Sequence, residues 1–72
     1  MNLSNLLADL KEGDYVHIKL NNELGTEWAG EISTVSNDGI WIDDNLSERF
    51  EFVSYADLKD WERKDILEFA LL

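Results

Sequence analysis

A pair of alternating runs around one turn signal limits the fold of this chain more than any other feature. The runs cover residues 27–35 and 40–44, and the four residues between them read Ser-Asn-Asp-Gly. Alternation of apolar and polar residues is the period of a half-buried β-strand. Asn, Asp and Gly tolerate the backbone conformations that short hairpin loops require. The sequence therefore predicts a β-hairpin, to which the remaining segments add strands and caps.

The length and composition predict a single small domain over residues 1–72. Seventy-two residues lie near the lower limit for folding without disulfides or metals, so the core must be rich in large side chains. Three Trp, three Phe and two Tyr supply such side chains, and cysteine is absent. No apolar run approaches the roughly 20 residues of a transmembrane helix, and residues 1–7 do not resemble a signal peptide. We therefore expect a cytoplasmic protein without membrane association.

Acidic residues outnumber basic ones by sixteen to six, which gives a net charge of −10. Such a surface repels phosphate groups and anionic lipids, and it attracts cationic partners at long range. The same charge also keeps a small, aromatic-rich domain in solution. The charge alone therefore favours a basic partner without requiring one.

Four segments, residues 14–20, 27–35, 40–44 and 49–53, alternate between apolar and polar side chains. One face of each segment should point into the core, because successive side chains of a strand lie on opposite faces. The predicted core consists of the inward-facing members of these four runs: Val16, Ile18, Leu20, Trp28, Ile32, Ile40, Ile42, Phe50 and Phe52.

The two ends of the chain predict helices and one further strand. Leucines at helical spacing indicate a short amphipathic helix over residues 3–11. Residues 54–57 resemble one helical turn with a serine cap, and a fifth strand is predicted at 58–63. The apolar tail, residues 65–72, is interpreted as a helix that folds back on the domain, which favours a monomer over a homo-oligomer. One continuous helix over 55–70 is the alternative interpretation.

This order of elements resembles the Sm-like version of the SH3-type barrel. The resemblance is carried by the patterns at residues 16–20 (Val-His-Ile-Lys-Leu), 28–32 (Trp-Ala-Gly-Glu-Ile) and 39–43 (Gly-Ile-Trp-Ile-Asp). Gly30, in the middle of the second run, is typical of a bend or bulge in a strand that serves both halves of a barrel. The resemblance implies a mainly β fold, a small five-stranded barrel over residues 14–63 that follows the short N-terminal helix.

RNA binding, which the Sm-like family performs, does not transfer to this chain. The family uses an Asp and an Asn in the loop after the second strand, and a basic segment after the fourth. Here the acid and amide of residues 36–39 stand at other positions, and residues 53–56 contain no Arg, Lys or His. Since phosphate contacts dominate affinity for nucleic acids, we expect no direct nucleic-acid binding.

The sequence contains no pattern typical of an enzyme. His17 is the only histidine, and nothing in the sequence pairs it with a nucleophile. The four glycines are scattered, so no phosphate-binding loop is present. The acidic turn at residues 43–48 lacks the spacing of a calcium loop. We therefore predict a non-enzymatic protein without cofactors or bound metals.

Trp41 is the best candidate for a partner-binding residue. Alternation places it opposite Ile40 and Ile42, on the same face as Asp43. An exposed tryptophan among acids suits a basic or proline-rich partner, because aromatic faces attract cations and pack against flat ligands. The predicted binding set is Trp41, Asp43, Tyr15, Glu31 and Glu51. Alternatively, the N-terminal helix or the tail covers Trp41.

A second hypothesis assigns a function to the carboxylates themselves. Small phage- or plasmid-borne inhibitors occupy nucleic-acid-binding proteins by presenting acids spaced like phosphates. Glu27, Glu31, Asp43 and Glu51 lie on three predicted strands and are candidates for such a face. The first hypothesis requires an apolar contact, whereas this one requires a continuous acidic face.

Overall fold

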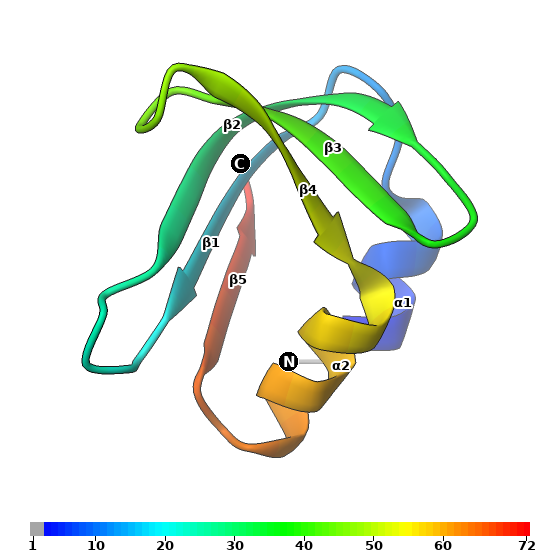
Figure 1. Cartoon of the computed structure of the whole chain (residues 1–72). Helices are drawn as coiled ribbons and strands as arrows, with labels where there is room; N and C mark the ends of the chain where they lie inside the picture. The colour runs from blue at the N-terminus through cyan, green and yellow to red at the C-terminus, as the bar shows by residue number, and fades with distance from the viewer. Residues whose placement is uncertain (1–2) are drawn as a thin grey trace.

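The computed structural model of the chain describes residues 3–72. Five strands and two helices follow one another along the chain (Figure 1). They are α1 (Leu3–Asp9), β1 (Tyr15–Leu20), β2 (Glu27–Val35), β3 (Gly39–Asp44), β4 (Arg49–Ser54), α2 (Tyr55–Arg63) and β5 (Leu67–Leu71).

All five strands belong to one antiparallel sheet with the order β4-β3-β2-β1-β5. The predicted hairpin is confirmed as β2 and β3, and its turn is closed by the Ser36 N–H, which donates to the Gly39 carbonyl at 2.9 Å. The sheet is strongly curved (Figure 1). Within residues 3–72 no pairing joins β4 to β5, so the sheet is open and both strands are edges.

The inner face of the sheet and the two helices enclose one hydrophobic core. The alternation predicted for β1 and β3 is confirmed, because every second residue of these strands is buried. Leu3 and Leu10 from the N-terminal segment and Leu58 from α2 complete the core. The buried apolar side chains of the core are Leu3, Leu10, Val16, Ile18, Leu20, Ile32, Ile40, Ile42, Val53, Leu58 and Phe69.

The side chains of strand β4 point to the opposite faces of the sheet from those predicted. Phe50 is 62% exposed and Phe52 also lies on the surface, whereas Val53 is only 2% exposed. The register explains this result, because Val53 pairs with the buried Ile40 and Phe50 pairs with the outward-facing Asp43. Opposite residues of two paired strands share a face of the sheet. The two phenylalanines are therefore outside the core, contrary to the prediction.

Residues 58–63, predicted as a strand, belong to helix α2. The helix begins at the predicted serine cap, where the Ser54 hydroxyl accepts a hydrogen bond from the Asp57 N–H at 3.1 Å. Leu58 and Trp61 are three residues apart and so lie on the same side of the helix. Leu58 is fully buried, and the Trp61 ring stacks on Trp28 with 5.8 Å between centroids. Trp28, predicted in the core, is half-buried and packs against the core at its edge.

The apolar tail folds back on the domain, as expected, but as a strand and not as a helix. Helix α2 ends where Asp65 adopts a positive φ of 59°, which also excludes the continuous helix over 55–70. Strand β5 then pairs with the free edge of β1, opposite residues Val16 to Leu20. Pairing satisfies the main-chain groups of β1, which a helical tail could not do.

Two smaller expectations are also corrected. Gly30 is not the site of the bulge, since the register between β2 and β3 shifts between Ile32 and Thr34. Instead Gly30 permits a close approach of strands, because a Cβ atom there would lie 2.0 Å from the Asp43 carbonyl oxygen. Helix α1 ends at Asp9, two residues before the predicted end. Neither helix in the described part of the chain is long and apolar enough to cross a membrane.

The orientation of side chains on β3 and β4 predicts that substitutions at Ile42 and Phe50, both predicted in the core, lower the free energy of unfolding by clearly different amounts. We expect Ile42→Ala to lower the free energy of unfolding by about 2–5 kcal/mol, because Ile42 is completely buried. Phe50→Ala removes a larger side chain from the surface and should cost less than about 1 kcal/mol. Urea unfolding of both variants measures this difference. Equal losses, or a larger loss for Phe50→Ala, would contradict the register.

Candidate functional site

The outer face of the sheet, which points away from the helices, carries most of the predicted binding residues. In one row across the sheet, Tyr15 of β1 pairs with Glu31 of β2, which pairs with Asp43 of β3, which pairs with Phe50 of β4. In the next row Trp41 pairs with Phe52. We call Tyr15, Glu31, Trp41, Asp43, Phe50 and Phe52 the aromatic–acidic patch.

The aromatic side chains of this patch are exposed to solvent. Trp41 is 42% exposed and leans on Phe52, with 5.2 Å between ring centroids and an angle of 51° between the rings. Phe50 and Tyr15 are exposed as well. Neither α1 nor the tail covers Trp41, because α1 packs on the inner face and the tail pairs with β1. Large aromatic side chains are usually buried, at least in part. A cluster of exposed ones is therefore typical of a contact surface.

Glu51 is the one predicted binding residue that the structure separates from the others. It pairs with Ile42 and therefore lies toward the inner face, at the edge of the sheet. There it accepts a hydrogen bond from the Arg49 guanidinium at 3.3 Å. Phe50 and Phe52, expected in the core from the alternation of residues 49–53, are exposed members of the patch that the sequence did not predict. The two possible orientations of β4 differ by one residue in the length of the loop between β3 and β4. A shift of one residue in register moves every side chain of the strand to the other face of the sheet.

Of the four carboxylates considered for a phosphate mimic, Glu27, Glu31 and Asp43 lie on the outer face and Glu51 does not. Glu27 contacts the His17 imidazole, and Lys19 pairs with Glu27 across the strands. Glu31 and Asp43 stand between aromatic residues. The acids of this face therefore lie among Lys19, the His17 imidazole and aromatic rings.

The Asp44 carboxylate connects the end of β3, strand β2 and the loop that leads to β4 through hydrogen bonds. Asp44 is only 2% exposed, and its carboxylate accepts hydrogen bonds from the N–H groups of Ala29 (2.9 Å), Leu46 (3.3 Å) and Ser47 (3.1 Å). Burial raises the pKa of Asp44, but these hydrogen bonds, together with one from the Ser47 hydroxyl, outweigh it and lower the pKa below its ordinary value. The loop thereby places Arg49 opposite Asp44 and so fixes Phe50 and Phe52 in the patch.

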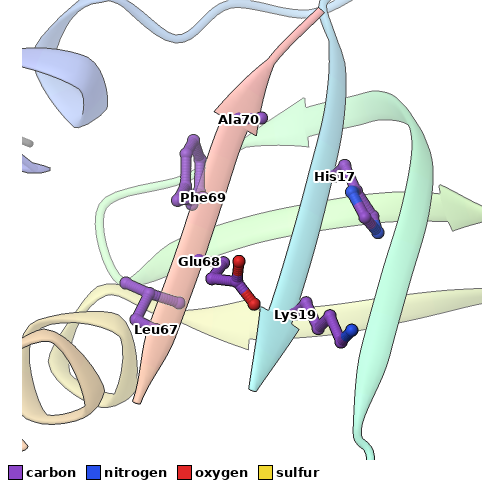
Figure 2. Close-up of a pocket in the computed structure, with 6 residues that line it drawn as sticks. All are labelled: His17, Lys19, Leu67, Glu68, Phe69 and Ala70. Carbon is purple, nitrogen blue, oxygen red and sulfur yellow. The ribbon is translucent and has the colours of Figure 1, made fainter. Parts of the chain in front are cut away.

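At the other end of the outer face, strands β1 and β5 border an open hollow of about 430 Å³. His17 and Lys19 of β1 line it, together with residues 67–70 of β5 (Figure 2). His17 pairs with Ala70 and Lys19 with Glu68, so the small Ala70 side chain leaves space beside the histidine. Among residues 3–72, no group of three potential metal ligands is close enough to hold an ion.

Comparison with models of protein families, with curated proteins and with solved structures found no match to this chain. What the protein does must therefore be inferred from its own residues.

The lowered pKa of Asp44 predicts a stability that depends on pH. A carboxylate whose pKa is lower in the folded state stabilises the fold above its unfolded pKa of about 4, and this contribution is lost as the pH falls through the folded pKa. We expect Asp44→Asn to cost about 1.5–3 kcal/mol at pH 7, because three N–H donors lose a charged acceptor. The difference from the unaltered protein should narrow below about pH 4.

Urea unfolding between pH 7 and pH 2 measures this effect. Asp43→Asn is the matched control, because it changes the neighbouring exposed carboxylate and should leave the stability nearly unchanged. A difference between Asp44→Asn and the unaltered protein that stays constant over the whole pH range would contradict the role of the charge.

Proposed function

We propose that this chain is a non-enzymatic protein-interaction module that binds a basic, extended segment of another protein on the aromatic–acidic patch. The observation that carries the proposal is the row in which two carboxylates, Glu31 and Asp43, stand between the exposed rings of Tyr15 and Phe50. Rings and acids at strand spacing match a segment whose side chains alternate between cationic and apolar. An intracellular, cytoplasmic setting is part of this proposal.

Each component of the patch has a defined role toward such a segment. The faces of Trp41 and Phe52 provide a flat apolar contact that also attracts the guanidinium of an arginine. The carboxylates of Glu31 and Asp43 can each accept a pair of parallel hydrogen bonds from an arginine. The net charge of −10 accelerates the encounter with a cationic partner and disfavours nucleic acids and anionic membranes. Aromatic contacts therefore supply affinity, and the charge supplies selectivity.

We also propose that the fold is an opened variant of the Sm-like barrel. Support comes from the single helix before the first strand, the irregular second strand between Ile32 and Thr34, and the helical segment before the fifth strand. Helix α2 is longer than a single turn, and it stands where a closed barrel would join β4 to β5.

The proposal predicts that Trp41 is essential for binding a basic peptide. We expect an unstructured peptide of alternating arginine and proline, about ten residues long, to shift the NMR signals of Trp41, Asp43 and Phe52 in the ¹⁵N-labelled protein. Trp41→Ala should weaken the affinity at least tenfold, as expected for a central aromatic contact. Asp43→Asn should weaken it less, and this smaller effect should fade at high salt.

Leu24→Ala is the matched control, because Leu24 is an 88% exposed apolar residue in the loop between β1 and β2. It should leave the affinity unchanged, and a peptide of alternating glutamate and proline should not bind. Equal losses for Trp41→Ala and Leu24→Ala would contradict the proposal. Binding that is unaffected by Trp41→Ala but abolished by salt, with a partner that DNA or RNA displaces, would instead favour an acidic mimic of nucleic acid.

A further inference from the structure

The aromatic–acidic patch occupies two successive rows of the outer face. Trp41 pairs with Phe52 in the first row, and Asp43 pairs with both Glu31 and Phe50 in the second. Trp41 and Asp43 are two residues apart on β3, so the rows are separated by one repeat of a strand, roughly 6.8 Å. An extended segment that lies along β3 has the same repeat. Its side chains at positions i and i+2 therefore fall on the two rows.

The two rows differ in the chemistry that they offer to a partner. The first row presents the faces of Trp41 and Phe52 and, on β2, the uncharged Thr34, which pairs with Trp41. In the second row the exposed side chains of Glu31 and Asp43 stand opposite each other. Neither carboxylate belongs to an ion pair among residues 3–72. The first row therefore suits an apolar side chain, and the second suits a cation.

The carboxylates beyond the patch already face cations of the same chain. Further along the outer face of β1, His17 pairs with Ala29, and then Lys19 pairs with both Glu27 and Glu68. Glu27 also contacts the His17 imidazole. A cationic side chain of a partner would meet Lys19 there. The part of the outer face that suits a cation is therefore confined to the second row of the patch.

We propose that the patch recognises a short motif, one apolar residue and one arginine two positions apart in an extended segment. This inference rests on the proposed function and narrows the class of partner. The apolar side chain packs on Trp41 and Phe52. The guanidinium lies against the Phe50 ring and donates to the carboxylates of Asp43 and Glu31, whose Cβ atoms are about 4.5–5.5 Å apart as in any directly opposite pair. Arginine is favoured over lysine, because a planar guanidinium stacks on a ring and donates to carboxylates at once, whereas an ammonium is a compact point charge.

The two facing carboxylates should destabilise the chain when no partner is bound. Like charges directly opposite on paired strands repel each other, and here no cation of the chain offsets the repulsion. Glu31→Gln should therefore raise the midpoint of urea unfolding while it weakens binding of an arginine peptide. Glu23→Gln is the matched control, because it changes the net charge equally in the exposed loop between β1 and β2 and should leave binding unchanged. A lower midpoint for Glu31→Gln would contradict this account of the pair.

Peptides of equal composition but different spacing test the motif. In Ser-Leu-Ser-Arg-Ser-Leu-Ser a leucine stands two residues from the arginine in either chain direction. In Leu-Ser-Ser-Arg-Ser-Ser-Leu the leucines and the arginine lie on opposite faces of an extended segment. We expect the first peptide to bind roughly tenfold more tightly, measured from the NMR shifts of Trp41 and Asp43 in the ¹⁵N-labelled protein. Lysine in place of its arginine should weaken binding about two- to fivefold.

Substitutions at Phe50 test whether the ring causes the preference for arginine. Phe50→Leu keeps an apolar side chain but removes the flat face, so the arginine and lysine peptides should bind alike. Phe50→Tyr is the matched control and should retain the preference. Equal affinity for both spacings, or a preference for arginine that survives Phe50→Leu, would overturn this inference but leave the proposed function standing. No shift of the patch signals with any basic peptide would overturn both.

Discussion

The carboxylate of Asp44 is the interaction on which the arrangement of this sheet depends. It joins β2, the end of β3 and the following loop through hydrogen bonds to Ala29, Leu46 and Ser47. The loop bends back through Glu48, whose φ is 61° and whose N–H donates to the Asp44 carbonyl at 2.9 Å. Because the loop has a fixed length, the register of β4 is fixed with it. A buried charge that is fully hydrogen-bonded can serve such a purpose, since any other loop would leave it unsatisfied.

The register separates the two sides of the sheet into different roles. Val53 enters the core with Ile40 and Ile42, which stabilises a domain that has little apolar area to bury. Phe50 and Phe52 then have no inner position and extend the surface around Trp41. In a chain this small, exposing three large rings forgoes stabilisation that the core would otherwise gain. We propose that contact with a partner on the outer face offsets this loss.

The regular strands could be predicted from the sequence, but the edges of the sheet could not. Clean alternation around Ile18 and Ile42 allows only one facing, because the polar residues between them cannot be buried. The segment from Arg49 to Val53 allows two facings, and the larger phenylalanines favoured the wrong one. The tail around Phe69 suits a helix or a strand, and the choice depends on the unpaired edge of β1, which is a tertiary property. The shared face of Trp41, Asp43, Tyr15 and Glu31 could be predicted because these residues lie on regular strands.

The most direct test of this account is a measurement of proton–proton nuclear Overhauser effects between β3 and β4 in solution. The register predicts strong effects between the rings of Trp41 and Phe52, and between the Phe50 ring and the Asp43 side chain. It also predicts effects between the methyl groups of Val53 and Ile40. Contacts of the Phe50 and Phe52 rings with the methyl groups of the core isoleucines would contradict it, because the register, the surface and the proposed partner would then all be wrong.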